Sequence, residues 1–367
     1  MPSTVRANKV RKSVVSVVAF RKLIIQIPCF NEEQTLAIAL SHLPREVPGY
    51  DTVEWLIVDD GSTDDTVRVA REHGVDHIVS LRHNQGLARG FMAGIEASLK
   101  LGADTIVNTD ADNQYDASCI PDLVAPIVEG KAEIVVGARP INDTPHFSGI
   151  KKFLQRLGSF AVRVASNTSI PDAPSGFRAI HREAAMRMFV FSEYTYTLET
   201  IIQAGRKNMR ITSVPVRTNE DLRPSRLVKS IASYVQRSLV TILRVFITYK
   251  PLRACFTVGS VFALGAAALG LRFLWAFMTG DGAGKVQSLI LLSVLAMASF
   301  VSFAVGVIAE LQAANRNLLE DIRLRLLRAE LASEETRSQR ARFDQVRQEL
   351  AETDPAQRPA GLQSRAG

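Results

Sequence analysis

The chain has 367 residues and a formal net charge of +7; 47% of its residues are hydrophobic and 22% are charged. Single hydrophobic cores usually stop growing near ~250–300 residues, so this length leaves room for one catalytic domain and a further segment. Positive charge collects at the N-terminus and around apolar runs near the C-terminal end, without a nucleic-acid-binding motif, which favours an anionic membrane over nucleic acid as partner. The three cysteines lack CxxC spacing, which argues against a disulfide framework and a zinc site.

A basic arm at residues 1–21 precedes a region that alternates strand and helix patterns. The strand patterns lie at 23–28, 55–60, 77–81, 104–110, 132–140, the end of 171–180, and 211–217. The helix patterns lie at 31–44, 62–74, 87–102, 150–166 and 194–208. Such repetition predicts an α/β fold, with a mainly parallel sheet and helices on both of its faces.

The character of the chain changes after the last predicted strand. Residues 222–253 contain no acid and seven Lys or Arg among apolar side chains, which predicts interfacial helices on an anionic leaflet. Two apolar runs, 254–278 and 286–309, are each long enough for the ~20 residues that cross a bilayer. Positive charge crowds both outer flanks of this pair, so both termini and the α/β domain are expected in the cytoplasm of a cell with an inner or plasma membrane.

The last segments are a charged helix at 310–352 and a disordered tail at 353–367. We predict a solvated helix. It carries a weak apolar repeat of Leu311, Leu318, Ile322 and Leu326. A coiled-coil seam for a homo-oligomer therefore stays open, although Arg325 interrupts it.

Acidic residues follow two of the predicted strands. Residues 108–116 read NTDADNQYD, and carboxylates this close repel each other unless a cation or hydrogen-bond donors compensate. Mg²⁺ and Mn²⁺ prefer oxygen ligands and commonly bridge carboxylates to substrate phosphates. A solvated surface turn is the alternative for an isolated pair of this kind. The segment VDDGSTDD ends another strand, and ligands of open sheets bind at the carboxyl ends of strands, so both acidic groups are expected in one crevice.

Four motifs occur in order: IPCFNEE (27–33), VDDGSTDDT (58–66), NQGLARGFMAG (84–94) and NTDADNQY (108–115). With VVGAR (135–139), SGFR (175–178) and the two predicted membrane helices, the chain resembles family 2 glycosyltransferases with a GT-A fold. Within these it most resembles the polyprenyl-phosphate glycosyltransferases, the group of dolichol-phosphate mannose synthase. The resemblance covers roughly residues 22–230, with a looser match to about 310, and implies a GT-A catalytic domain at 22–221, ahead of a membrane part at 254–309.

The resemblance implies a nucleotide-sugar site. Pro28, Asn31 and Glu32 would line its nucleotide edge. Asp59 and Asp60 would hold the base and ribose of a UDP- or GDP-linked sugar, as carboxylates at a strand end can. For Asp59, capping of the next helix is the alternative.

The resemblance also implies a Mg²⁺ or Mn²⁺ site made by Asp112, Gln114 and Asp110, with Asp110 also facing the sugar or ribose. Bound there, the metal would stabilise the diphosphate as it leaves. Asp110 and Asp112 are thus predicted catalytic residues.

A lipid phosphate is already ionised near neutral pH, so as an acceptor it needs a cationic cradle rather than a base. The predicted cradle contains Arg139, Lys151, Lys152, Arg156 and Arg178, of which Arg139 and Arg178 are also predicted catalytic residues. The three residues Lys151, Lys152 and Arg156 could instead form the wet face of an amphipathic helix. The resemblance adds Arg223 and Ser225 from RPSRLVK.

We therefore predict a membrane-bound, metal-dependent transfer of a sugar from a nucleotide diphosphate to a polyprenyl phosphate, and the resemblance implies that the transfer is inverting. One alternative is transfer to a sugar hydroxyl in polysaccharide or glycolipid synthesis, with Asp172 or Glu199 as base, although no QxxRW-type motif is found. A second alternative is a non-catalytic membrane scaffold with the same shell.

Overall fold

The computed structural model describes residues 20–140, 163, 166, 168–190, 196–219, 251–280 and 286–353. Five predicted acceptor-phosphate residues lie outside this part of the chain: Lys151, Lys152, Arg156, Arg223 and Ser225. The predicted interfacial helices up to residue 250, and nearly all of the N-terminal arm and the C-terminal tail, also lie outside it.

A seven-stranded sheet forms the centre of the domain, with the order β3-β2-β1-β4-β6-β5-β7. Its strands are β1 (Lys22–Cys29), β2 (Thr52–Asp59), β3 (His77–Ser80), β4 (Thr105–Asn108), β5 (Ile134–Ala138), β6 (Arg178–His181) and β7 (Ile211–Pro215). The sheet is mainly parallel, as predicted, but β6 runs antiparallel to both of its neighbours, β4 and β5. Because of this reversal, the first residue of β6, Arg178, lies at the edge where the other strands end.

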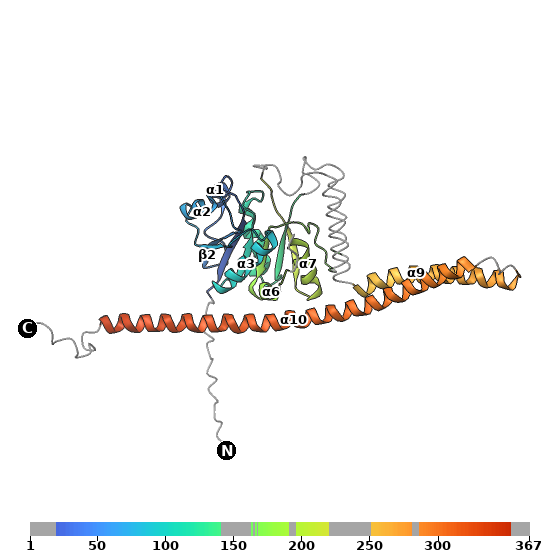
Figure 1. The fold of residues 1–367 in the computed structure, drawn as a ribbon. Coiled ribbons are helices and arrows are strands. Elements are labelled where there is room, and N and C mark those ends of the chain that lie inside the picture. Colours follow the sequence, from blue (N-terminus) through green and yellow to red (C-terminus); the bar gives the residue numbers. More distant parts are fainter. Residues whose placement is uncertain are drawn as a thin grey trace, which may run out of the picture.

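Helices cover both faces of the sheet (Figure 1). They are α1 (Leu36–His42), α2 (Thr66–Glu72), α3 (Leu87–Lys100), α4 (Ile120–Val128), α6 (Arg182–Arg187) and α7 (Thr197–Arg206), with a short 3₁₀ turn η1 (Ala117–Cys119) before α4. The helix α1 begins later than the predicted residue 31. Asn31 has a φ of +55°, which is outside the helical region, and the chain turns before Leu36.

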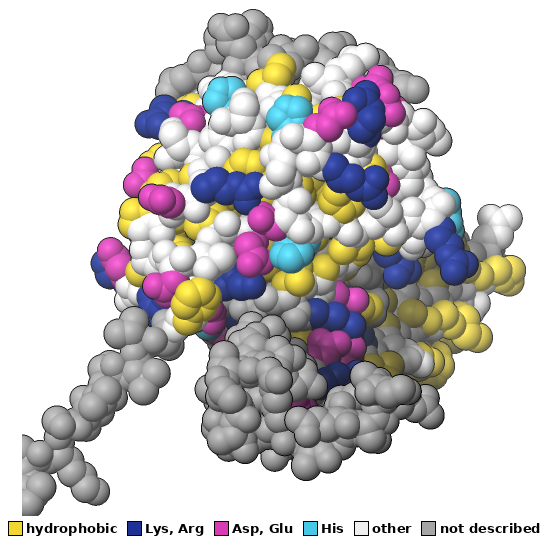
Figure 2. All heavy atoms as spheres, turned by 90° about the vertical axis from the view of Figure 1, so that its left-hand side faces the viewer, with side chains coloured by type: hydrophobic (Ala, Val, Ile, Leu, Met, Phe, Trp, Pro, Cys, Tyr) yellow, Lys and Arg dark blue, Asp and Glu magenta, His cyan; other side chains and the backbone are white. Residues whose placement is uncertain are grey.

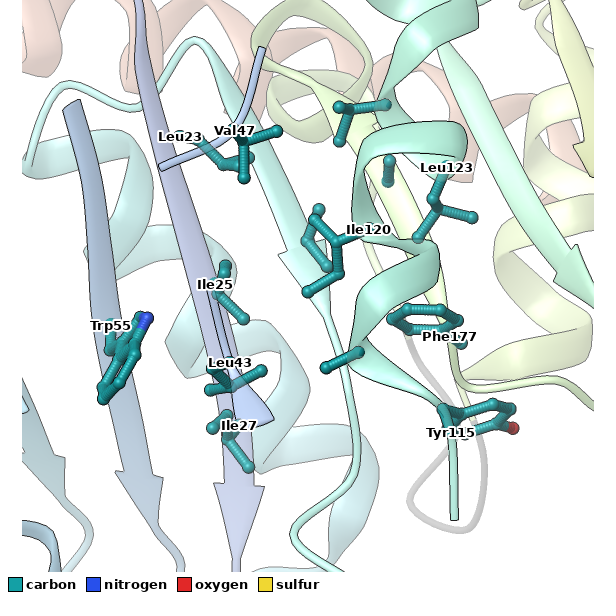
Figure 3. Packing of buried hydrophobic residues seen from close by; sticks show 14 of the residues in the cluster. Leu23, Ile25, Ile27, Leu43, Val47, Trp55, Tyr115, Ile120, Leu123 and Phe177 are labelled. Atoms are coloured by element: carbon teal, nitrogen blue, oxygen red, sulfur yellow. The ribbon is translucent and has the colours of Figure 1, made fainter. Parts of the chain in front are cut away.

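Alternate residues of β1 face the two cores, as expected for a strand buried on both sides. Ile25 and Ile27 point to the side of α4, where Ile120 and Leu123 meet them (Figure 3). Ile24 faces the opposite core, which α3, α6 and α7 cover. Near the end of β4, the rings of Tyr115 and Phe177 stack with their centroids 5.1 Å apart, which ties the acidic segment to the start of β6.

Two long helices follow the domain: α9 (Pro251–Met278) and α10 (Val286–Thr353). Both contain a window long and apolar enough to cross a membrane, with mean hydropathies of 1.9 and 2.4, and only 11% of each window is buried. The helices pack closely where Ser299 donates a hydrogen bond to the Gly259 carbonyl at 2.8 Å. Their positions agree with the predicted apolar spans.

The helix α10 does not end at the predicted boundary near residue 309 but continues without a break to Thr353 and passes along the domain (Figure 1). The prediction of a solvated helix is wrong for one side of it, where Leu327 and Leu331 are buried against the core beneath α3 and α6. The residues of the weak apolar repeat, Leu311, Leu318, Ile322 and Leu326, lie on the exposed side. The coiled-coil seam stays a prediction.

Candidate active site

The predicted site residues that the structure describes gather at one edge of the sheet. Asp59 ends β2, Asp110 follows β4, and Arg139 follows β5. Arg178 pairs in register with both Asn108 of β4 and Val136 of β5. The structure therefore brings together the acids that the sequence placed at separate strand ends, and it adds two arginines to them.

The first two motifs hold each other through hydrogen bonds. The Oδ1 atom of Asn31 accepts from the backbone N–H of Thr63 at 2.8 Å, and the N–H of Asn31 donates to the Ser62 hydroxyl at 3.0 Å. The backbone N–H of Glu32 donates to the Thr66 hydroxyl at 2.9 Å. These bonds fix the loop after β1 against the loop after β2, and half-buried Pro28 lies at the end of β1 beside them.

The two acids at the end of β2 are both about 4% exposed and have different partners. Asp59 accepts from the N–H of Ser62 at 2.9 Å, so it closes a turn and does not cap α2, which begins at Thr66. Asp60 accepts from the N–H groups of Gln85 and Gly86, both at 2.8 Å. Asp60 thus binds the third motif, a partnership that neither motif alone could reveal.

Gly61, between these acids and the following loop, has a φ of +73°. A Cβ atom there would lie 2.7 Å from the His83 carbonyl carbon, closer than real side chains approach. Only glycine therefore allows the second and third motifs to meet this closely.

The acid Asp110 lies in an unfavourable electrostatic position. Burial, and then the charge of Asp112, raise the pKa of Asp110 to about 7. Gly176 faces this carboxylate so closely that an added Cβ would lie 3.1 Å from the Asp110 Oδ2 atom. A divalent cation would offset the repulsion between the two acids, so these residues fit the predicted metal.

Asp112 and Gln114 lie in the turn that follows. The Asp112 Oδ1 atom accepts from the N–H of Gln114 at 3.2 Å, and Asn113 between them has a φ of +57°. Asn219, which follows β7 and which the sequence did not single out, donates from its side chain to the Asn113 carbonyl at 2.9 Å. Among the described residues, no group of three or more His, Cys, Asp or Glu could hold a metal alone. The donor set suits Mg²⁺ or Mn²⁺ that also binds substrate phosphates.

Arg139 forms a bidentate pair with Asp172. Its Nε and Nη2 atoms donate to the two carboxylate oxygens at 2.8 and 3.1 Å, and its backbone N–H adds a third bond at 3.2 Å. The Asp172 side chain is fully buried and that of Arg139 is 16% exposed. Burial opposes the charge of Arg139, but Tyr115 and Asp172 outweigh it and raise the pKa of the guanidinium above its ordinary value. Asp172 thus fixes Arg139 at this edge of the sheet.

Arg178 is fully buried, and burial lowers the pKa of its guanidinium. It donates to the carbonyls of Ser175 and Ala173, both at 2.9 Å, and to the Thr200 hydroxyl. The predicted contact between Arg178 and an acceptor phosphate does not fit this conformation, because the side chain has no exposed surface. Arg178 instead supports the loop that carries Gly176.

A buried polar network, which the sequence did not predict, lies beneath the acids. Gln26 donates to the Asn108 side chain at 2.9 Å. Asn108 in turn donates to the Gly176 carbonyl and the Tyr196 hydroxyl, both at 2.9 Å. The network connects β1 and β4 to the loop before β6, and so it fixes the floor on which Asp110 stands. Its signal in the sequence is the polar Gln26 inside an apolar strand.

The chain belongs to glycosyl transferase family 2, whose model matches residues 24–189. An uncharacterized glycosyltransferase of Mycobacterium tuberculosis is 31% identical over 194 residues, which cover 52% of this chain and 83% of the relative. A UDP-N-acetylglucosamine–dolichyl-phosphate N-acetylglucosaminyltransferase of Methanococcus voltae is 29% identical over 217 residues, 52% of this chain and 83% of the relative. An undecaprenyl-phosphate mannosyltransferase of Micrococcus luteus is 27% identical over 202 residues, which cover 52% of this chain and 80% of the relative.

Among solved structures, the chain is similar to glucosyl-3-phosphoglycerate synthase from Mycobacterium tuberculosis in complex with Mn²⁺, UDP and glucosyl-3-phosphoglycerate. The TM-score is 0.47 at 20% identity, over 60% of this chain and 80% of that one. The predicted family 2 membership and GT-A fold class are confirmed, and the relatives include enzymes named for polyprenyl-phosphate acceptors.

Proposed function

We propose that this glycosyltransferase moves a sugar from a UDP- or GDP-linked donor to a polyprenyl phosphate at a membrane. The observation that carries the proposal is the site itself: Asp110 and Asp112 lie close enough for their charges to interact, at the sheet edge that also carries Asp59 and the fixed Arg139. The two apolar helices and the names of the relatives support a lipid acceptor. The positive flanks of these helices favour a catalytic domain and termini in the cytoplasm.

The donor nucleotide would bind at the loops after β1 and β2. Asp59 would hold the base or ribose, beside Asn31 and Glu32, with Pro28 at the same edge. Asp60, whose two oxygens already bind Gln85 and Gly86, would keep the third motif closed around the nucleotide. These assignments rest on the position of each residue and on the resemblance of the motifs.

Asp112 and Gln114 would hold Mg²⁺ or Mn²⁺, with Asp110 beside them. Bound there, the cation would stabilise the negative charge that develops on the departing diphosphate. In the same proposal Asp110 stays ionised and orients the sugar or ribose. The turn would keep its shape through the hydrogen bond from Asn219 to Asn113.

The acceptor phosphate would bind at Arg139, which Asp172 orients from below. A phosphate oxygen attacks the anomeric carbon from the face opposite the diphosphate, a C–O bond to the lipid phosphate forms, and the C–O bond to the nucleoside diphosphate breaks. The configuration at that carbon is inverted. No base is needed because the phosphate is already ionised. Lys151, Lys152, Arg156, Arg223 and Ser225 stay predicted acceptor contacts, whereas we assign Arg178 a positioning role.

The hydroxyl-acceptor alternative needs a carboxylate base at the crevice. Asp172 is fully buried and paired with Arg139, and Glu199 is 8% exposed and accepts from Gln203 at 3.4 Å. Neither is placed to take a proton from a sugar hydroxyl. The scaffold alternative gives no reason to keep the repelling acids Asp110 and Asp112 in a crevice.

Radiolabel transfer in membranes tests the proposal. Membranes that contain the chain receive a panel of UDP- and GDP-sugars with added polyprenyl phosphate, with and without EDTA. We expect a chloroform-soluble, mild-acid-labile product that requires the metal and is lost in Asp112→Ala. The matched control is Asp122→Ala, which removes an exposed acid of α4 outside the crevice. Label in a water-soluble or polymeric product would contradict a lipid-phosphate acceptor, and no transfer from any donor would favour the scaffold.

A further inference from the structure

The stretch of α10 that follows its apolar window docks on the catalytic domain. Leu327 and Leu331 are 8% and 4% exposed and pack into the core beneath α3 and α6. Arg323 lies with its guanidinium carbon 4.5 Å from the centre of the Phe189 ring and donates to the Met188 carbonyl at 3.0 Å. We call residues 316–331 the docking stretch.

Four ion pairs connect the docking stretch to α3, to α6 and to Lys207, the residue that follows α7. They are Glu320 with Lys207 (2.8 Å), Arg323 with Glu96 (3.0 Å), Arg328 with Glu183 (2.9 Å) and Glu330 with Lys100 (2.8 Å). Three of the four are substantially exposed, so each contributes little to affinity by itself. Together they select one register, while the buried leucines provide most of the apolar contact.

The order of these contacts along α10 shows which part of the domain lies nearer to its apolar window. Lys207, between α7 and β7, meets the helix at Glu320, whereas Lys100, at the end of α3, meets it at Glu330. Ten residues of helix separate the two contacts, about 15 Å along the axis at 1.5 Å per residue. Figure 1 shows the same order: α7 lies nearest to α9, while α1 and α2 lie at the far end of the domain.

The site residues are arranged along the same direction as the contacts with α10. Arg139, at the end of β5, lies beside the β7 edge of the sheet, and Asp59 ends β2, toward the opposite edge. The far end of the domain, around α1 and α2, presents Lys, Arg, Asp and Glu side chains interspersed, as is usual for a surface in water (Figure 2). The side of the crevice that carries Arg139 is therefore turned toward the apolar helices, and the nucleotide side away from them.

We propose that the docking stretch is a strut that sets this orientation, so that a phosphate at the bilayer surface enters the site from the Arg139 side. The orientation is independent of the reaction, but the role in acceptor entry rests on the proposed function. The strut acts as part of the rigid helix that leaves the membrane, because α10 is unbroken from Val286 to Thr353.

Energy transfer to labelled lipids tests the orientation without using activity. The full chain, with Cys255→Ala, is reconstituted into vesicles and labelled at Arg210→Cys, before β7, or at Arg71→Cys on α2. The other two cysteines are buried. We expect stronger transfer to the lipids from position 210 than from position 71. Equal transfer, or the reverse order, would overturn the orientation.

Undocking tests the role of the strut. The variant Leu327→Asp/Leu331→Asp changes the buried side of the helix, and its matched control Leu318→Asp/Leu326→Asp places the same charges on the exposed side. Cross-linking of Lys100→Cys with Glu330→Cys by a short bis-maleimide reports docking. We expect the undocked variant to lose the cross-link and the difference in energy transfer, while UDP or GDP binding with Mn²⁺ shows that the domain is folded.

The activity of the same variants tests acceptor entry. We expect transfer to a long-chain polyprenyl phosphate in vesicles to fall at least tenfold on undocking, and transfer to a short-chain, water-soluble analogue to stay within twofold. The control should keep both. Unchanged vesicle transfer despite a lost cross-link would overturn the role of the strut. If the wild type transferred to neither lipid, the proposed function and its acceptor clause would fail, whereas the energy-transfer result would still decide the orientation.

Discussion

The buried carboxylate of Asp172 offers a sharp test of the site through the substitution Asp172→Asn. Both of its oxygens accept from the Arg139 guanidinium, at 2.8 and 3.1 Å. Asparagine keeps the shape but loses one charge-assisted hydrogen bond, a cost of ~1.5–3 kcal/mol. Breaking a buried ion pair costs ~3–5 kcal/mol, and because Arg139 is 16% exposed, water offsets part of this cost.

We therefore expect Asp172→Asn to reduce stability by about 2–3 kcal/mol, which corresponds to a melting temperature lower by roughly 5–10 °C for a domain of this size. Thermal melts of the full chain in detergent, followed by the fluorescence of Trp55 in β2, measure the change. The activity assay is transfer to polyprenyl phosphate. We expect at least a tenfold loss, mainly as a raised KM for the lipid phosphate, with donor affinity unchanged.

The double variant Asp172→Asn/Arg139→Gln decides whether the two residues act as one unit. If Asp172 acts by orienting Arg139, the double variant should transfer no more slowly than Arg139→Gln alone, because the orienting group has nothing left to orient. A double variant whose loss is the product of the two single losses would refute this reasoning. A fall in kcat for Asp172→Asn at unchanged KM would instead indicate a base.

Three further predictions concern single residues. In Gly176→Ala the new Cβ atom would lie 2.9 Å from the Tyr196 hydroxyl and 3.1 Å from the Asp110 Oδ2 atom. We expect the transfer rate to fall at least tenfold and the fold to lose ~1–3 kcal/mol of stability, as measured by thermal melts. An unchanged transfer rate would contradict the close contact. Asn219→Ala removes the side-chain hydrogen bond to the Asn113 carbonyl in the turn that carries Asp112, so the Mn²⁺ concentration for half-maximal transfer should rise several-fold. An unchanged metal titration would show that the turn keeps its shape without this hydrogen bond. Glu54 pairs with Lys22 and His77, each at 2.9 Å; burial opposes its ionisation, but these partners lower its pKa below the ordinary value. These ion pairs therefore stabilise the fold above the ordinary glutamate pKa of ~4.3, and this contribution is lost as the pH falls through the lowered pKa of Glu54. Glu54→Gln should cost about 0.5–1 kcal/mol at pH 7 and progressively less as the pH falls through that lowered pKa; a pH-independent cost in thermal melts would contradict the pairing.

Much of the domain could be predicted from short-range patterns. Runs such as 23–28 and 55–60 are the buried strands β1 and β2, and the acids that end the strands lie at one edge of the sheet, because parallel strands end at one edge. The reversal of β6 could not be predicted, since a strand of four residues, RAIH, carries no information on its direction in the sheet. That reversal brings Arg178 to the edge of the sheet where the site lies. Arg178 was predicted to bind phosphate, but it is fully buried and donates to the Ser175 carbonyl, so it supports the neighbouring loop.

Contacts between residues far apart in the sequence could not be predicted either. Asp172 and Arg139 are 33 residues apart, and nothing in their local sequence indicates that they pair. For α10 a signal existed, because Leu324, Leu327 and Leu331 recur at helical spacing beside the exposed repeat that contains Leu318. When one charged helix carries two apolar stripes, the sequence does not show which of them is buried unless the surface that it packs against is known. The structure resolves this, since Leu327 and Leu331 are buried against the domain.

The nature of the acceptor is the central claim, and a direct competition tests it. The purified chain in nanodiscs, with its metal and the donor found in the membrane panel, receives equal amounts of a polyprenyl phosphate and the polyprenol of the same chain length. Mass spectrometry of the lipid extract identifies the product. We predict a sugar joined to the polyprenyl phosphate alone, with release of one nucleoside diphosphate for each sugar. A sugar joined to the free hydroxyl of the polyprenol would contradict the account, because that reaction needs a base that Asp172, paired with Arg139, does not supply.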